Sequence, residues 1–141
     1  MKKLVLGQML LLAQMVLSQG HKVELTVQGI DTAAGGSIQA GLFNDASTKW
    51  DPSTSFMSIR AKVEKGTMNL IFEYVPEGTY AAAVFHDIDD NGELKRNFFT
   101  IPKEPVGFSN GQRIRLGAPG FQKCSFPVDS GTAKEIVLVE Y

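Results

Sequence analysis

The stretch TYAAAVFH, residues 79–86, decides the class of this fold. Its three alanines favour a helix by propensity alone, whereas Tyr80, Val84 and Phe85 around them favour a strand. The segment VPEG, residues 75–78, places a turn directly before the stretch. We therefore predict a short central strand that is buried on both faces, because small apolar residues on both sides suit close packing.

The segments around this stretch alternate apolar and polar residues with a period of two, which is typical of half-buried strands. In KVELTVQG, for example, Val23, Leu25 and Val27 share one face. Lys65 and Gly66 are expected to form a tight hairpin turn between the third and fourth strands. The seven predicted strands are KVELTVQG (22–29), GSIQAGLF (36–43), MSIRAKVEKG (57–66), MNLIFEY (68–74), TYAAAVFH (79–86), FQKCSFPV (121–128) and EIVLVEY (135–141).

Seven short strands without an amphipathic helix of three turns predict an antiparallel β-sandwich of the immunoglobulin or transthyretin kind. A closed barrel is the second choice. Two connections are long: residues 44–56, which hold Trp50, and residues 87–120, which we expect to be one ordered loop without secondary structure. Trp50 lies in a polar segment, so its ring is either a rim contact for a ligand or a lid on one end of the sandwich.

The N-terminus has the layout of a secretory signal peptide, with Lys2 and Lys3 ahead of the apolar run Leu4–Leu17. We assign residues 1–20 to the signal peptide and 21–141 to a single domain, and we expect a periplasmic or secreted protein without a membrane span after cleavage. Removing both lysines leaves 12 basic against 15 acidic residues without a basic cluster, so we expect no nucleic-acid partner.

The segment DIDDNG after the central strand carries the first half of a calcium-loop pattern, with Asp87, Asp89 and Asn91 as alternating oxygen donors before Gly92. Phe98 stands where an EF-hand needs its bidentate glutamate, so any calcium binding is expected to be weak, with Glu104 or backbone carbonyls completing the set. The alternative is an Asx-rich turn, in which Asp87 or Asn91 accepts backbone hydrogen bonds and Gly92 adopts a positive φ.

Three other residues, Ser109, His86 and Cys124, have side chains of the types that take part in catalysis or metal binding. GFSNG, residues 107–111, fits the G-x-S-x-G nucleophile elbow, but no histidine follows Ser109 in the sequence. His86 is expected to anchor the strand end to the loop, and a zinc site is disfavoured because its only companions are His21 and Cys124. We predict that Cys124, the sole cysteine, is buried and unpaired on the inward face of its strand with Phe126.

The run PEGTYAAAVFHDIDDNGELKRNFFTIPKEPVGFSNG, residues 76–111, resembles an exported bacterial family known only as a domain of unknown function. Its signature is roughly PGxYAVAxxHDxNxNGxLDxNxxGxPxEGxGFSN. The resemblance implies a β-sandwich and no assigned activity. Lys95, Thr100 and Pro105 depart from the pattern, and the loss of an acid at position 95 weakens any inherited calcium site. The matching residues are His86, Asp87, Asn91, Gly92, Asn97, Pro102, Glu104, Gly107, Phe108, Ser109 and Asn110.

These observations predict an exported, non-enzymatic β-sandwich that binds or scaffolds at the cell envelope, with residues 87–120 as its most specific surface. The ligand or partner is not identified by the sequence, and no cofactor is expected. The alternative is a calcium-stabilised binding module that uses residues 87–92. A hydrolase centred on His86 and Ser109 is the least favoured interpretation.

Overall fold

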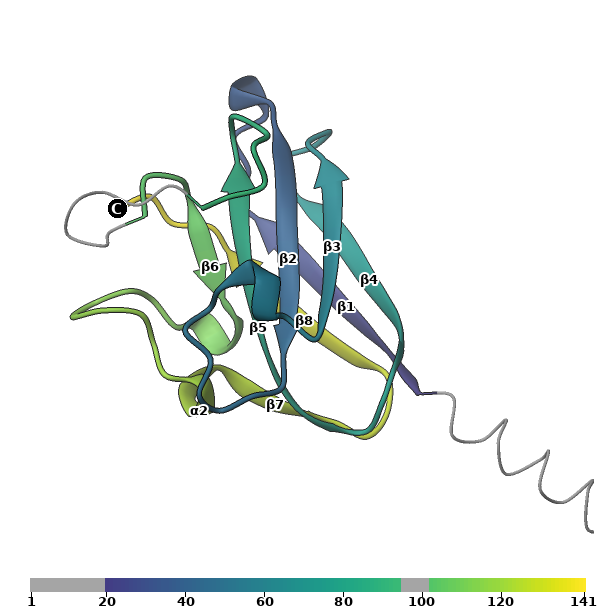
Figure 1. The fold of residues 1–141 in the computed structure, drawn as a ribbon. Helices are drawn as coiled ribbons and strands as arrows, with labels where there is room; N and C mark the ends of the chain where they lie inside the picture. Colours follow the sequence, from purple (N-terminus) through teal and green to yellow (C-terminus); the bar gives the residue numbers. More distant parts are fainter. Residues whose placement is uncertain (1–19, 95–101) are drawn as a thin grey trace, which may run out of the picture.

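The computed structural model describes residues 20–94 and 102–141, which form two packed β-sheets (Figure 1). One sheet has the strand order β4-β1-β8 and the other β3-β2-β5-β6, with β7 also paired to β5. The predicted β-sandwich is confirmed. The predicted signal peptide falls almost wholly outside the described residues. The strands are β1 (His21–Gln28), β2 (Ser37–Phe43), β3 (Met57–Lys62), β4 (Met68–Val75), β5 (Gly78–Asp87), β6 (Val106–Phe108), β7 (Ser125–Val128) and β8 (Thr132–Val137).

β5 is the central strand that the sequence predicts. It pairs with β2 along one side and with β6 and β7 along the other. Every residue from Tyr80 to Asp87 is buried except Ala83, which is half-buried. Alanines are compatible with this strand because both of its faces are covered, which makes packing rather than propensity decide its conformation.

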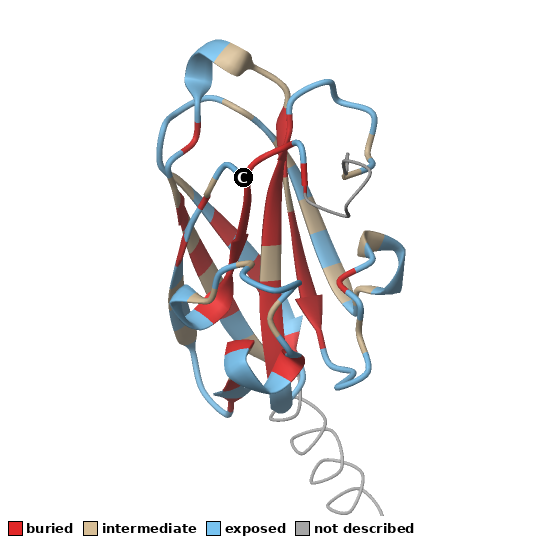
Figure 2. Cartoon of the chain, turned by 90° about the vertical axis from the view of Figure 1, so that its left-hand side faces the viewer, coloured by how far each residue is buried: buried red, intermediate tan, exposed pale blue. Residues whose placement is uncertain are grey.

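The two faces of β5 belong to two separate apolar clusters. Tyr80, Ala82 and Val84 pack between the sheets with residues of β1, β2, β4 and β8. Ala81 and Phe85 point to the other face of the five-stranded sheet, where loops cover them. Figure 2 shows the buried residues concentrated along the central strands. The protein therefore has an inner core between the sheets and an outer cluster on the five-stranded sheet.

Two predictions about strand pairing are wrong. β8 pairs with β1 in parallel, so the sandwich is not purely antiparallel. Lys65 and Gly66 do not form a hairpin turn, because β3 lies in the five-stranded sheet and β4 in the three-stranded one. The connection between these strands therefore crosses from one sheet to the other. Apolar alternation identifies a strand but does not name its partner, which explains both errors.

The segment 87–120 also contains secondary structure that the sequence did not reveal. β6 forms within it and is followed by the short helix η3 (Ser109–Gly111). The predicted strand 121–128 begins with a helical turn, α2 (Phe121–Cys124), so only its second half is β7. Short helices η1 (Thr32–Ala34) and η2 (Pro52–Thr54) lie in two other connections. None of the helices in the described ranges is long and apolar enough to cross a membrane.

Candidate functional site

The outer face of the five-stranded sheet divides into an apolar half and a polar half. The alternating residues Gly41 and Phe43 of β2 and Ala83 and Phe85 of β5 belong to the apolar half. Further along the same face, Ser37, Gln39, Arg60 and Asp87 belong to the polar half. Both long connections fold over this face, so residues distant in the sequence meet there.

Trp50 is the centre of the apolar half. Its ring lies edge-on to Phe43 and to Phe108, with centroid distances of 5.2 Å in both pairs. Its indole Nε1 donates a hydrogen bond of 2.8 Å to the carbonyl of Pro119, which ties the two long connections together. Trp50 has a φ of 62°, a left-handed conformation that bulky residues rarely adopt and that is often found where a structure holds a ligand.

An apolar hollow of about 90 Å³ lies beside Trp50. Its floor is formed by β2, β5 and β6, and its walls come from the two long connections. It opens into a wider groove where Lys49, Asp51 and Glu93 join the lining. The hollow is lined by Gln39, Ala40, Gly41, Phe43, Trp50, Pro52, Ser55, Ser58, Ala83, Val84, Phe85, Leu94, Pro102, Val106, Phe108, Ile114 and Ala118. We refer to this set as the outer hollow.

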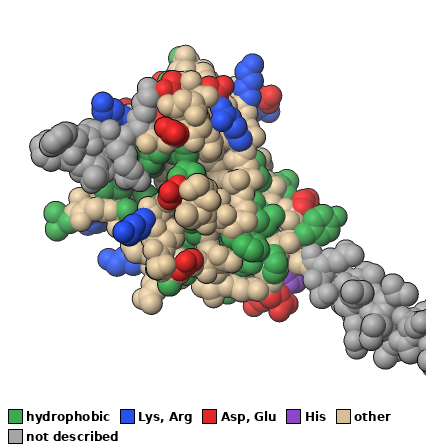
Figure 3. Space-filling model, in the orientation of Figure 1, with side chains coloured by type: hydrophobic (Ala, Val, Ile, Leu, Met, Phe, Trp, Pro, Cys, Tyr) green, Lys and Arg blue, Asp and Glu red, His purple; other side chains and the backbone are tan. Residues whose placement is uncertain are grey.

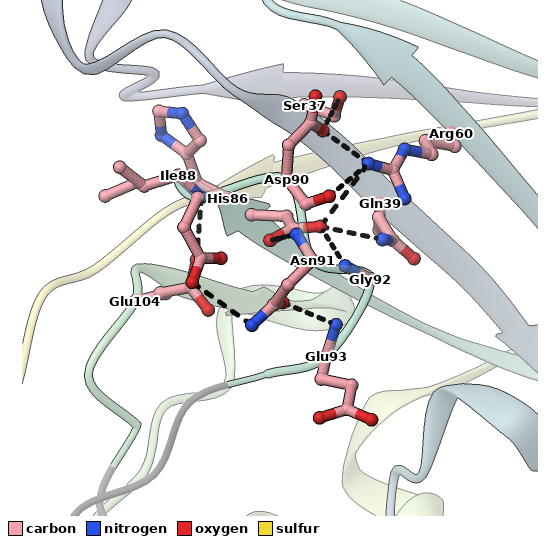
Figure 4. A network of polar contacts seen from close by, with 12 residues as sticks. Ser37, Gln39, Arg60, His86, Ile88, Asp90, Asn91, Gly92, Glu93 and Glu104 are labelled. Atoms are coloured by element: carbon pink, nitrogen blue, oxygen red, sulfur yellow. Dashed lines mark hydrogen bonds and ion pairs between the residues drawn. The ribbon is translucent and has the colours of Figure 1, made fainter.

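Asp87 organises the polar half. Its carboxylate is fully buried and accepts hydrogen bonds from the backbone amides of Asn91 (3.2 Å) and Gly92 (2.7 Å). It also accepts from the Gln39 Nε2 at 3.1 Å, and the Arg60 guanidinium lies 3.8 Å away. Figure 4 shows these groups converging on one carboxylate. The predicted Asx-rich turn is therefore confirmed, and Gly92 has the predicted positive φ, 80°.

Asp90 fixes the turn to the neighbouring strands. Its carboxylate accepts hydrogen bonds from the Ser37 hydroxyl at 2.5 Å and from Arg60 of β3. The hydrogen bond from Ser37, followed by that from Arg60, holds the pKa of the Asp90 carboxyl below its ordinary value. This role of Asp90 could not be predicted from the sequence, because its partners Ser37 and Arg60 lie on strands far from the turn in the chain.

Three carboxylates gather where the turn meets the segment before β6. Asp87, Asp89 and Glu104 can each place an oxygen within 4.8 Å of the others. Glu104 is buried and accepts a 2.6 Å hydrogen bond from the backbone amide of Ile88. Asn91, the third predicted ligand, donates through its side chain to Asp89 and accepts from the Glu93 amide. Asn97 lies outside the described residues.

His86 points away from these acids. Successive residues of a strand face opposite sides, and the His86 ring bonds the carbonyl of Gly35 at 2.6 Å while its backbone amide bonds Pro105. Because a carbonyl only accepts, Nε2 carries the proton and Nδ1 is left as the acceptor. Nδ1 has no hydrogen-bond partner among the residues that the structure describes. His86 thus ties the end of β5 to the loops on both sides.

Ser109 and Asn110 hold the backbone together. The buried Ser109 hydroxyl accepts a hydrogen bond from the Ala82 amide at 3.0 Å and has one proton to donate, to the Cys124 carbonyl at 2.5 Å or the more distant Ala82 carbonyl at 3.3 Å. The Asn110 amide donates to the carbonyls of Lys123 and Ser125. Ser109 therefore shares no hydrogen bond with a histidine in the described part of the chain. Cys124 is buried and free of a disulfide, as predicted, and burial raises the pKa of its thiol to about 11. Its predicted place on the inward face with Phe126 is wrong, because Cys124 packs in the outer cluster while Phe126 lies in the inner core.

Comparison with known families agrees with the resemblance found in the sequence. A family model described as an uncharacterized protein conserved in bacteria, DUF2141, matches residues 25–136. The chain belongs to this family. No curated protein and no solved structure matches it. The DUF2141 match spans β1 to β8, so it includes the outer hollow and the turn after β5.

Sequence reasoning found the turn of this DUF2141 chain but not the outer hollow. The turn residues are consecutive and carry a recognisable spacing, whereas the hollow assembles single side chains from five separate segments. Trp50 was the one available signal, because a lone tryptophan between polar residues needs an apolar partner.

Proposed function

We propose that this protein is an exported, non-enzymatic binding module that receives an apolar group in the outer hollow. The observation that carries the proposal is the hollow itself, an apolar space beside Trp50 on a sheet face that two long connections surround. Ligand sites in proteins are concave and mostly apolar, with a few polar groups that orient the ligand. Gln39, Ser55 and Ser58 supply those polar groups at its border.

The segment 87–120 contributes much of the wall. Leu94, Pro102 and Ile114 line the hollow from this segment. The rigid sheet supplies the floor, because Ala83 and Phe85 belong to the central strand. A rigid floor beneath variable loops is the usual arrangement for a binding site.

The size of the outer hollow indicates the size of the group. Its volume is about 90 Å³, and an apolar cavity of about 150 Å³ holds a benzene molecule. The outer hollow is smaller than that cavity, so a short branched alkyl group would fill it, and an aromatic ring would fill it and extend into the adjoining groove. The rest of a larger ligand would extend into the adjoining groove past Lys49, Asp51 and Glu93.

Two further parts of the proposal rest on other observations. Export is supported by Lys2, Lys3 and the apolar run Leu4–Leu17. The absence of catalysis is supported by the roles of Ser109, which bonds backbone amide and carbonyl groups, and of His86, whose ring bonds a loop carbonyl. Both residues act as structural hydrogen-bonding groups.

Iodobenzene provides a direct test, because its ring would fill the outer hollow and reach into the adjoining groove, and its iodine quenches tryptophan fluorescence on contact. Trp50 is the only tryptophan, so its emission reports this site alone. We expect saturable quenching in the native protein and simple collisional quenching of a free tryptophan derivative. Ala83→Leu should abolish the saturable phase, because the larger side chain fills the floor of the hollow.

Ala133→Leu is the matched control, since Ala133 lies exposed on β8 in the other sheet. It should leave the quenching unchanged. Equal saturable quenching in the wild type and in Ala83→Leu would place the bound ring elsewhere and refute the proposed site. Purely collisional quenching in the folded wild type would also count against it.

A calcium-stabilised form of the module is the second candidate, and the meeting of Asp87, Asp89 and Glu104 favours it. Binding should be weak, because Asp87 already accepts three protein hydrogen bonds. Calorimetric titration of chelator-treated protein with calcium tests this candidate. Saturable binding that Asp89→Asn abolishes would support a calcium site, whereas the absence of measurable heat would reject it.

A further inference from the structure

The loop of residues 112–120, between η3 and α2, projects from the sandwich (Figure 1). Leu116 has a relative exposure of 107%, so its side chain packs against nothing. A single exposed leucine is common on protein surfaces and adds little to the stability of the fold, so the groups around Leu116 decide what it can contact. We call residues 112–120 the projecting loop.

Positive charge surrounds this leucine. Arg113 and Arg115 are exposed, and neither forms an ion pair with any carboxylate that the structure describes. Residues 105–128 contain these two arginines and Lys123 but no Asp or Glu, in a chain with a formal net charge of −1. Figure 3 shows hydrophobic and basic side chains along the edge where the loop projects. The loop itself thus carries only positive charge on a slightly acidic protein, and Asp51 and Glu93 line the groove at its side.

The projecting loop is fastened at its base, so its tip is held away from the body. The Asn110 side chain bonds the carbonyls of Lys123 and Ser125, which joins the two ends of the loop. Half-buried Ile114 lines the outer hollow, and its amide bonds the Tyr141 hydroxyl at 3.0 Å. The backbone amide of Arg115 donates a hydrogen bond of 3.2 Å to the carbonyl of Gly117 across the tip. Ile114 thus faces the protein while the arginines on either side of it are exposed.

We propose that the projecting loop docks on the surface of an anionic phospholipid bilayer. Leu116 enters the boundary between headgroups and acyl chains, while Arg113 and Arg115 bind lipid phosphates. Arginine suits this role because its guanidinium bonds phosphate in a bidentate manner and dehydrates more readily than an ammonium group. The contact is peripheral and reversible, because one leucine and two arginines supply too little free energy for a permanent anchor.

The shape of the loop favours a bilayer over a protein partner. A protein surface would need a pocket that matches a single convex leucine, together with acids at the spacing of both arginines. A fluid bilayer closes around a convex tip and brings phosphates to it without prior complementarity. Each arginine near an anionic membrane surface strengthens binding about fivefold.

The test measures the environment of position 116 directly. Leu116→Cys is labelled with the fluorophore NBD, which stays selective because Cys124 is buried. Vesicles of phosphatidylcholine with phosphatidylglycerol should shift the NBD emission to the blue, and vesicles of phosphatidylcholine alone should not. The same label on Val137→Cys, exposed on the three-stranded sheet, is the control and should not shift. Because the label reports contact at the loop itself, binding of the full chain through residues 1–19 does not imitate this result.

Charge variants test the electrostatic contribution to membrane binding, which is measured as the partition of the labelled chain onto vesicles. Arg113→Gln with Arg115→Gln should lower the membrane partition at position 116 roughly 25-fold. Lys22→Gln with Lys65→Gln removes the same charge from other exposed sites and should change the membrane partition by less than about twofold. No shift with anionic vesicles would overturn the proposal, as would equal shifts with neutral ones. A shift produced by polyglutamate but not by vesicles would overturn it in favour of an acidic protein partner.

Discussion

Replacing Asp87 should weaken the fold more than any other change in the turn after β5. The carboxylate is fully buried and accepts three hydrogen bonds, from Gln39, Asn91 and Gly92. Hydrogen bonds to a charged acceptor contribute about 1.5–3 kcal/mol each, but rehydration of donors near the surface returns part of this loss. We expect Asp87→Ala to cost about 3 kcal/mol. The half-exposed Arg60 at 3.8 Å adds little to this figure.

The assay is urea unfolding followed by far-UV circular dichroism and by Trp50 fluorescence, in the presence of a chelator. With a slope of about 1.5 kcal/mol per molar urea, Asp87→Ala should lower the midpoint by about 2 M. Asp87→Asn keeps one acceptor oxygen and should lose about half as much free energy of unfolding. Asp89→Asn is the control, because Asp89 is exposed and should change the free energy of unfolding by less than about 0.5 kcal/mol.

Two results would refute this reasoning. A stability of Asp87→Ala within about 0.5 kcal/mol of the wild type would show that the carboxylate does not organise the turn. A loss of stability in Asp87→Ala that appears only when calcium is present would show that an ion, rather than the backbone amides, is the partner of Asp87.

Other consequences follow from single positions. Gly92→Ala should cost about 1 kcal/mol in urea unfolding, because φ is 80° while the nearest atom to a new Cβ is 3.6 Å away. Gly107→Ala should cost more, about 2–3 kcal/mol, since its Cβ would lie 2.5 Å from the Ile136 Cγ2 atom. Cys124 should resist thiol reagents in the native protein; the free energy of unfolding should fall from pH 9 toward 11, because the unfolded thiol ionises first. Ser37→Ala should raise the NMR-measured pKa of Asp90 toward 3.8, and the stability that this carboxyl contributes is lost as pH falls through its lowered pKa.

The strands with apolar alternation could be predicted, because their pattern reflects a half-buried surface. β1, β2 and β4 lie close to the predicted segments, and β5 was identified despite its alanines. β6 was missed because three residues between Pro105 and Ser109 are too few to show a period of two. The helical turn of α2 was missed for a similar reason, since Cys124 and Phe126 suggested one continuous alternation.

The candidate site likewise has a local part that the sequence predicts and a long-range part that it does not. The turn is local, so the spacing of Asp87, Asn91 and Gly92 sufficed to predict its backbone hydrogen bonds. The position of Trp50 was left open between a ligand contact and a lid on the sandwich end. The structure places it on the outer face of the five-stranded sheet, against Phe43 and Phe108. Such long-range packing depends on which strands pair, and alternation does not encode that.

The most direct test of the binding site is a crystal structure of the protein soaked in iodobenzene. We expect an anomalous iodine peak inside the outer hollow, in contact with Trp50 and Ala83. The peak should vanish from crystals of Ala83→Leu and persist in those of Ala133→Leu. A hollow that stays empty in wild-type crystals, with iodine absent or bound only elsewhere, would contradict the proposal.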